Sequence, residues 1–236
     1  LQFPELYRKY KVPIPNGILL YGPPGCGKTF FTRKLSEHLG YYFIETKPSD
    51  LASIYVHGTQ QLIGKLFEEA IANAPCLLFI DEIDAFVPNR GGHNLGHHYS
   101  AEVNEFLTQL NECSKRNILV VAATNLIDNI DSAILRPGRM DKKIFVPPPD
   151  QEARSEAFKL FMEGRPQGTI DWIRLSEYSD CYTFAEIEHV VNEAARHALE
   201  LRVNITTDNL IEALVSNPPA LTAEQITEMK KIGERD

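Results

Sequence analysis

The sequence predicts an α/β fold in which a parallel β-sheet is followed by a smaller helical part. Three observations support this prediction. Short apolar segments alternate with helical patterns over residues 17–146, these segments show little apolar–polar alternation, and a glycine-rich loop follows the first of them. Strands that alternate with helices pair in parallel through right-handed crossovers. Strands without internal alternation are those covered on both faces of a sheet.

The elements of the sheet follow one another in order along the chain. Residues 76–80, Cys-Leu-Leu-Phe-Ile, are the clearest buried strand. The expected strands cover 17–21, 41–46, 76–81, 117–123 and 142–146, and helices over 28–39, 59–73 and 99–113 separate the first four. A short helix over 5–10 and an extended, proline-containing segment precede them.

The sheet pattern stops at Pro147-Pro148-Pro149, and we place a domain boundary there. The predicted domains are therefore a large α/β domain over 1–149 and a small helical domain over 150–236. The expected helices of the second domain cover 151–162, 171–178, 184–201, 207–216 and 222 onward. Thr206 or Thr207 suits the N-cap of the fourth of these helices.

The glycine-rich loop has the spacing of a phosphate-binding loop. It consists of Gly22, Pro23, Pro24, Gly25, Cys26, Gly27, Lys28 and Thr29, and Phe30 follows in the helix. Glycines let the loop curl so that its N–H groups point into one concavity at a helix N-terminus, which suits a triphosphate. Lys28 is placed to reach the β- and γ-phosphates, and the Thr29 hydroxyl is placed to bind Mg²⁺. The alternative, a plain strand-to-helix turn, leaves the lysine and hydroxyl unexplained.

Polar residues at the ends of two later strands extend this site. Asp81 and Glu82 close a buried apolar strand, where carboxylates need cations or donors nearby. We expect Asp81 to hold Mg²⁺ and Glu82 to act as the base that activates water. Asn125 follows the next strand and is placed to orient that water, although a turn residue with an Asx bond is an equally common role.

Two arginines follow on a Pro-Gly turn, in the segment Leu135-Arg136-Pro137-Gly138-Arg139. Single surface arginines are usually solvated. A stiff outward pair, however, suits the recognition of a phosphate held by a neighbouring subunit.

The composition favours a globular, cytoplasmic protein. The chain has 236 residues, 43% of them hydrophobic, which is enough for a buried core. No segment approaches the roughly 18–20 apolar residues of a membrane span, and no signal peptide is recognisable at the start. The four cysteines lie far apart without a C-x-x-C pair, so reduced thiols are expected.

The charge is unevenly distributed. Residues 1–149 are neutral overall, and the net charge of −8 lies in residues 150–236. Nucleic-acid binding usually requires a basic face. We therefore expect no nucleic-acid partner.

Taken together, these motifs resemble the ATPase module of the classical AAA family, the ring-forming ATPases of protein unfolding and remodelling. The resemblance implies a P-loop NTPase (AAA+) fold with a five-stranded parallel sheet in the order 5-1-4-3-2 and a helical lid. Lys28 and Thr29 match Walker A, and Asp81 and Glu82 match Walker B. Asn125 matches sensor 1. Arg136 and Arg139 match the arginine fingers. The resemblance also implies a ring, usually a hexamer, with ATP at its subunit boundaries.

The sequence departs from the family pattern in two places. The aromatic pore loop falls on Tyr55, Val56 and His57, where the usual Gly-Glu is replaced by His57-Gly58. A core role for Tyr55 and Val56 is the alternative. Near the lid helix that starts at Phe184, this phenylalanine replaces a glycine that in the family lies close to the nucleotide.

A loop with three histidines, His93, His97 and His98, raises the question of a metal site. A glycine-rich loop offers neither a firm scaffold nor the hydrogen-bond partners that hold metal-binding side chains in place. A second pore loop whose histidines titrate near neutrality is the preferred interpretation.

The sequence thus predicts a Mg²⁺-dependent enzyme that hydrolyses ATP to ADP and phosphate and uses ring motion to unfold, thread or remodel a protein substrate or its adaptor. An alternative is an ATP-controlled assembly switch that threads nothing. A DNA-directed motor is disfavoured by the charge distribution. Membrane association stays open.

Overall fold

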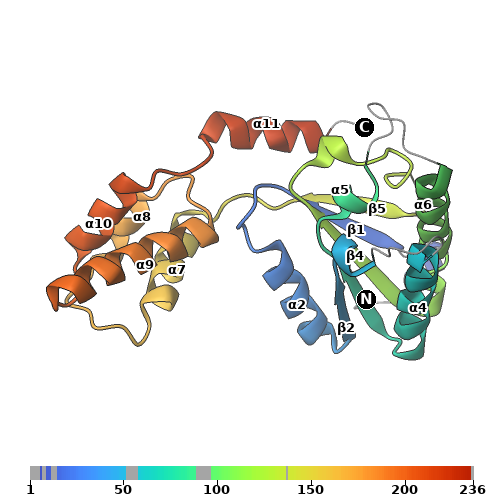
Figure 1. Cartoon of the computed structure of the whole chain (residues 1–236), viewed down its shortest axis with the longest axis horizontal. Coiled ribbons are helices and arrows are strands. Elements are labelled where there is room, and N and C mark those ends of the chain that lie inside the picture. Colours follow the sequence, from blue (N-terminus) through green and yellow to red (C-terminus); the bar gives the residue numbers. More distant parts are fainter. Residues whose placement is uncertain are drawn as a thin grey trace. The chain divides into compact units, whose positions relative to one another are not determined.

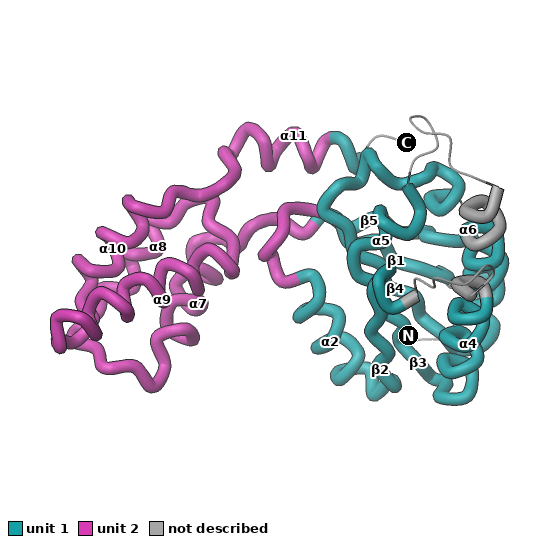
Figure 2. Tube along the Cα trace, in the orientation of Figure 1, with its two compact units in different colours: residues 1–21, 28–145, 232–236 teal, residues 22–27, 146–231 magenta. Residues whose placement is uncertain are grey.

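The computed structural model describes residues 6, 9–11, 15–51, 58–88, 97–136 and 138–234, with the side chains at 51, 58–60 and 97–102 excepted. The chain forms two compact units (Figure 2). The α/β unit comprises Leu1–Tyr21, Lys28–Phe145 and Ile232–Asp236, and the helical unit comprises Gly22–Gly27 and Val146–Lys231. The domain boundary at residue 149 stays a prediction.

A five-stranded parallel sheet forms the centre of the α/β unit (Figure 1). Its strands are β1 (Gly17–Tyr21), β2 (Tyr42–Thr46), β3 (Cys76–Ile80), β4 (Ile118–Thr124) and β5 (Met140–Phe145). Their order, β2-β3-β4-β1-β5, confirms the order that the family resemblance implies. The parallel register aligns Ile80 of β3 with Ala122 of β4, and Thr124 of β4 with Tyr21 of β1. The residues that follow these strands therefore meet at one edge of the sheet.

Helices cover both faces of this sheet, with α2 on one side and α4 and α6 on the other (Figure 1). The helices of the unit are α2 (Lys28–Leu39), α3 (Pro48–Leu51), α4 (Gly58–Ala72), α5 (Ile83–Phe86) and α6 (His97–Leu110), with 3₁₀ turns η1 (Ser114–Arg116) and η2 (Ile127–Asn129). Every residue of β3 is buried, as its uninterrupted apolar run predicts. Phe106 of α6 packs its ring against Phe67 of α4 and Phe86 of α5 in the same core.

The helical unit has its own apolar core. Its helices are α7 (Gln151–Met162), α8 (Trp172–Tyr178), α9 (Phe184–Leu201) and α10 (Thr207–Ser216), and α11 (Ala223–Gly233) runs on into the last residues of the chain. The N-terminus of α9 carries a capping box, in which the Thr183 hydroxyl accepts from the Glu186 N–H and the Glu186 carboxylate accepts from the Thr183 N–H. Thr206 and Asn209 cap α10 in the same way, as the sequence predicts for Thr206.

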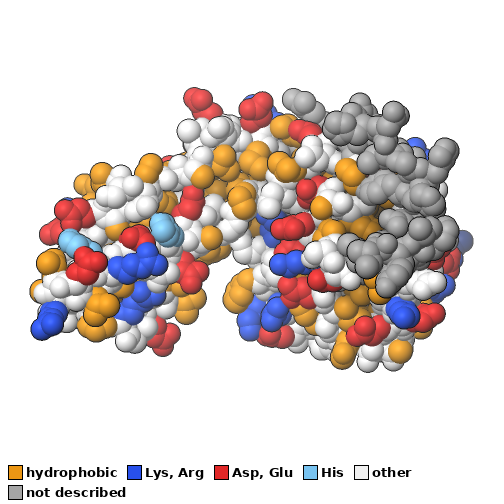
Figure 3. Space-filling model, in the orientation of Figure 1, with side chains coloured by type: hydrophobic (Ala, Val, Ile, Leu, Met, Phe, Trp, Pro, Cys, Tyr) orange, Lys and Arg blue, Asp and Glu red, His pale blue; other side chains and the backbone are white. Residues whose placement is uncertain are grey.

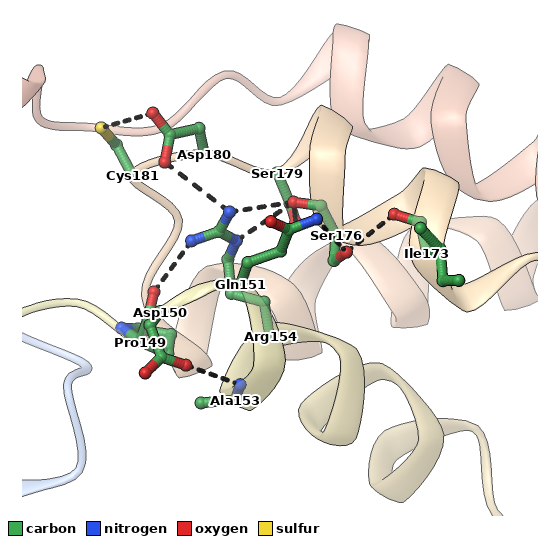
Figure 4. Close-up of polar contacts among 10 residues, drawn as sticks. All are labelled: Pro149, Asp150, Gln151, Ala153, Arg154, Ile173, Ser176, Ser179, Asp180 and Cys181. Atoms are coloured by element: carbon green, nitrogen blue, oxygen red, sulfur yellow. Dashed lines mark hydrogen bonds and ion pairs between the residues drawn. The ribbon is translucent and has the colours of Figure 1, made fainter.

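A buried arginine joins the first two helices of this unit (Figure 4). Arg154 of α7 is 6% exposed, and its guanidinium donates to the Pro149 carbonyl at 2.9 Å and to the Ser176 carbonyl at 2.9 and 3.3 Å. Asp180 adds an ion pair at 3.6 Å, but its side chain is largely exposed. The guanidinium thus ties the segment that precedes α7 to the end of α8.

Candidate functional site

The structure brings four of the predicted site residues together at the carboxyl edge of the sheet. Lys28, at the start of α2, is buried, and its ammonium donates to the Asn125 side-chain oxygen at 2.7 Å. The neighbouring Thr29 hydroxyl donates to the Asp81 carboxylate at 2.9 Å. Asp81 follows β3 and Asn125 follows β4, so the parallel register places both beside the start of α2.

Asp81 and Glu82 differ sharply in their surroundings. One carboxylate oxygen of Asp81 accepts from the Thr29 hydroxyl, and the other accepts from the Glu82 backbone N–H at 3.0 Å. A carboxylate beside a hydroxyl is a set of hard oxygen ligands of the kind that Mg²⁺ prefers, so these two residues fit the metal that the sequence predicts. Glu82 is exposed and has a left-handed backbone, with φ of 53°. A non-glycine residue in this conformation is strained, and such strain is common at functional sites.

Sequence reasoning missed the support behind Asn125. The Thr124 hydroxyl donates to the Asp84 carboxylate at 2.6 Å and accepts from the Leu126 N–H at 2.9 Å. These two bonds fix the backbone on either side of Asn125. The sequence does place Asp84 in the same acidic segment as Asp81 and Glu82, which marks it as a candidate site residue. Its partner could not be predicted, because Thr124 lies 40 positions away in the sequence.

The glycines of the loop belong to the helical unit and pack against the start of α9. Gly25 and Gly27 have positive φ, +75° and +83°. A Cβ on Gly25 would lie 2.7 Å from the Ala185 Cβ and 2.9 Å from the Thr183 hydroxyl, while the Ala185 N–H donates to the Gly25 carbonyl at 3.3 Å. The Phe184 ring lies 3.6 Å from the Cβ position of Gly27. The phenylalanine that replaces the family's glycine therefore covers the loop directly.

Other predicted loop residues vary in exposure. Gly22 and Pro23 are buried and Pro24 is exposed. Cys26 is only 5% exposed, and its thiol lies 3.9 Å from the Pro24 carbonyl. Phe30 is 67% exposed on α2. Its ring lies 5.9 Å from the Lys34 ammonium.

Tyr21, the last residue of β1, leads into the loop and packs against the end of α11. A Cβ on Gly233 would lie 2.1 Å from the Tyr21 ring, so only glycine fits at this position without a shift. Burial and, secondly, the charge of Glu234 raise the pKa of the Tyr21 phenol. The phenol is therefore neutral at physiological pH.

The two predicted arginines stand on a turn that follows the segment after β4. Arg136 is exposed. Arg139 is half-buried, and its guanidinium donates to the Ala133 carbonyl at 2.6 Å and to the Asn111 side-chain oxygen at 3.4 Å. The structure thus gives two arginines of the same motif different surroundings.

The predicted pore-loop residues Tyr55, Val56 and His57 lie outside the described residues, as does His93. His97 and His98 begin α6, and only their backbone is described. Among the described residues, no group of three or more His, Cys, Asp or Glu side chains is arranged to hold a metal ion. None of the described helices is long and apolar enough to cross a membrane. On the face shown in Figure 3, acidic and basic side chains are interspersed over both units.

Comparison with known proteins places these features in a family. Residues 18–148 match the family described as "ATPase family associated with various cellular activities (AAA)". The chain is 36% identical over 99% of its length to a cell division cycle protein 48 homolog of Archaeoglobus fulgidus, covering 34% of that protein. It is also 36% identical over 98% of its length to the ATP-dependent zinc metalloprotease FtsH 2 of Sphaerobacter thermophilus, covering 36% of it.

A third relative, the peroxisomal ATPase PEX1 of Cricetulus griseus, is 36% identical over 86% of the chain, which covers 16% of that protein. The chain thus spans about a third or less of the length of these relatives. The similarity covers the loop, the strand ends and the helical unit together.

Proposed function

The chain belongs to the AAA family of ATPases, and on that premise we propose that it binds ATP with Mg²⁺ on residues 22–29 and hydrolyses it to drive the remodelling of a protein substrate. The observation that carries this proposal is the pairing of Lys28 with Asn125 and of Thr29 with Asp81. These contacts join the end of the glycine loop to the carboxyl ends of two neighbouring strands, where ligands bind in parallel α/β sheets.

Each residue has a distinct role in the proposed reaction. The loop N–H groups and the Lys28 ammonium hold the β- and γ-phosphates, and the Thr29 hydroxyl and Asp81 carboxylate hold the metal ion. The Glu82 carboxylate accepts a proton from the attacking water. The Asn125 amide orients that water, since it already lies within hydrogen-bond distance of the lysine that binds the γ-phosphate. Bound Mg²⁺ supplies additional positive charge to the phosphate oxygens.

The charge that develops on the transferred phosphoryl group needs cations beyond Lys28. We assign this role to Arg136 and Arg139 acting on the ATP of a neighbouring copy, because an arginine supplied in trans accelerates such reactions by about 10³–10⁵. The proposed assembly is a homo-oligomeric ring, with six subunits as the expected number. Tyr55, Val56 and His57 are proposed to contact the protein substrate in the ring's pore.

The test of the proposed chemistry is a Glu82→Gln variant. It keeps the size and hydrogen-bonding capacity of the side chain but cannot accept the proton, so turnover is expected to fall by about 10²–10⁴ while ATP binding stays within about twofold. Glu112→Gln is the matched control, because Glu112 is a half-exposed residue that pairs with the exposed Lys115. Normal turnover in Glu82→Gln would overturn the assignment of the base.

The test of the proposed remodelling is Tyr55→Ala. Loss of substrate processing with retained ATPase activity is expected. If the chain is instead an assembly switch that threads nothing, Tyr55→Ala is expected to leave both its assembly and its ATPase activity nearly unchanged.

A further inference from the structure

A buried asparagine anchors the arginine turn (residues 136 and 138–141) to the sheet. Asn16, 8% exposed, precedes β1, and its side-chain N–H donates to the Gly138 carbonyl at 2.8 Å. Its side-chain oxygen accepts from the Ser114 N–H at 2.9 Å, and its own backbone N–H donates to the Asp141 carboxylate at 2.8 Å. The second oxygen of Asp141 accepts from the Gly138 N–H at 2.6 Å. Both ends of the turn are thus held to one residue at the start of the sheet.

The chain around the turn is closed by further bonds. The Arg139 N–H donates to the Arg136 carbonyl at 3.2 Å, and the Met140 N–H donates to the Ile134 carbonyl at 3.1 Å. Ile134 is fully buried. The Arg139 guanidinium reaches back to the Ala133 carbonyl, so this side chain spans the base of the same loop.

The turn also lies so close to β1 that a side chain at Gly17 would have no room. A Cβ on Gly17 would lie 2.5 Å from the Met140 sulfur and 2.9 Å from the Arg139 carbonyl oxygen. The backbone of residues 139 and 140 therefore rests directly on β1. The loop is thus closed by bonds at both ends and by contact with β1, and its exposed arginine is Arg136.

From this geometry we infer that the two arginines have different roles. Arg136 is the residue presented to the phosphate of a neighbouring subunit. Arg139 is a positioning residue that closes the loop on Ala133, and Asn16 with Asp141 fixes the loop to the sheet. The inference rests on the proposed function in trans and deepens it, since it names which guanidinium makes the contact.

The guanidinium of Arg139 already donates hydrogen bonds within its own chain. Its Nε and one terminal nitrogen donate within the chain, and the bond to the Ala133 carbonyl is a charge-assisted one. Each of the two forks by which this guanidinium could bind a phosphate bidentately therefore includes a nitrogen that already donates within the chain. The side chain of Arg136, by contrast, is exposed.

The first experiment compares conservative replacements. Arg136→Lys and Arg136→Gln are both expected to lower kcat by about 10³ with little change in ATP affinity, because a lysine lacks the bidentate fork that a phosphate takes. Arg139→Lys can still donate to the Ala133 carbonyl and is expected to keep kcat within about tenfold of the parent chain. Thermal unfolding and sedimentation establish that each variant is folded and assembled.

The second experiment tests Asn16 as a positioning residue. Asn16→Asp loses the donor to Gly138 and places a second carboxylate beside Asp141, so kcat is expected to fall at least tenfold at unchanged ATP affinity. Mixing Asn16→Asp subunits with Lys28→Ala subunits is expected to restore activity, since the first have a sound pocket and the second a sound turn. Asn73→Asp, at the end of α4, is the matched control.

The outcomes separate the inference from the proposed function. If kcat falls as far in Arg139→Lys as in Arg136→Lys, in a folded and assembled protein, both arginines contact the phosphate. The inference that the two have different roles is then wrong. A mixture that stays inactive would show that Asn16 supports its own subunit's pocket. If replacing Arg136 and Arg139 leaves turnover unchanged, action in trans itself is wrong.

Discussion

The ammonium nitrogen of Lys28 lies 2.7 Å from the side-chain oxygen of Asn125, across 97 positions of sequence. A neutral amide holds the lysine without neutralising its charge, so the ammonium keeps the positive charge that attracts a phosphate. Asn125→Asp would convert this contact into an ion pair and place a negative charge next to the triphosphate. We expect ATP affinity to fall at least tenfold in Asn125→Asp and less than threefold in Asn125→Ala, as measured by titration with a fluorescent ATP analogue. Equal affinities in the two variants would contradict this role of the amide.

A side chain is tolerated less well at Gly25 than at Gly27. Alanine there would adopt a left-handed φ, which costs about 1–2 kcal/mol, and would collide with Ala185 and Thr183 at the start of α9. Gly25→Ala is expected to weaken ADP binding more than tenfold, measured by calorimetry. Gly64→Ala is the control, because a Cβ on this helical glycine of α4 meets nothing within 4 Å. Unchanged binding in Gly25→Ala would mean that the loop and α9 separate easily.

Because two thiols are buried, the folded chain is expected to become less stable as the pH rises above 9. Burial raises the pKa of Cys113 to about 12 and that of Cys76 to about 11, and nearby Glu69 also raises the latter. Unfolded thiols ionise near pH 9 while the folded ones stay protonated, so stability that is complete below pH 9 is lost as the pH rises through 9 to 11. Each thiol contributes up to about 1.4 kcal/mol per pH unit to this loss.

Urea unfolding of the parent chain and of Cys113→Ala, measured between pH 7 and 11, tests this prediction. The variant is expected to be less stable at neutral pH, because it leaves a small cavity, but to lose stability less steeply above pH 9. Parallel pH dependences in the two proteins would show that Cys113 ionises as readily in the folded chain as in the unfolded one.

Arg154 is expected to be a major source of stability in the helical unit. Arg154→Met keeps much of the side chain's volume but leaves the Pro149 carbonyl without its donor, and it leaves the Ser176 carbonyl with only the Ser179 hydroxyl, at 3.3 Å. One buried acceptor without a partner costs about 1–3 kcal/mol. Arg174→Met is the control, because Arg174 is exposed and its pair with Asp208 is of the surface kind, worth about 0–1 kcal/mol.

Trp172, the chain's single tryptophan, reports this unfolding directly, because it packs against the core of the helical unit. Its fluorescence in urea is expected to change at a lower denaturant concentration in Arg154→Met than in Arg174→Met. Coinciding transitions would show that water or other donors satisfy the two carbonyls.

Most of the sheet could be predicted because buried parallel strands have an unmistakable pattern. β1 was predicted with its observed bounds, and β3 differs by one residue, since Asp81 follows the strand and does not belong to it. β5 begins at Met140, two residues before the predicted start at Lys142, because the charged Asp141 separates Met140 from the rest of the strand pattern. The same rule explains the site, since residues after adjacent parallel strands converge at one edge.

The contacts that support the site could not be predicted. Asn16 resembles any polar residue before a strand, and its partners lie 98 to 125 positions away. Arg154 stands in a helix of mixed charge, where solvated arginines are the rule, and only the packing of α7 on α8 buries it. The contact of Phe184 with Gly27 likewise depends on tertiary structure. Motif spacing thus identifies the residues proposed for the chemistry but not those that position them.

The order of the strands leaves β2 and β5 at the two edges of the sheet. An open edge offers unpaired backbone groups to other chains and is a common starting point of aggregation, which charged side chains oppose. Glu45 on β2 and Asp141 and Lys142 on β5 are exposed. These charges oppose the growth of the sheet from one molecule to the next. Self-association of this chain is therefore expected through its other surfaces. An ordered assembly can then form at high concentration, where open sheet edges would otherwise favour aggregation.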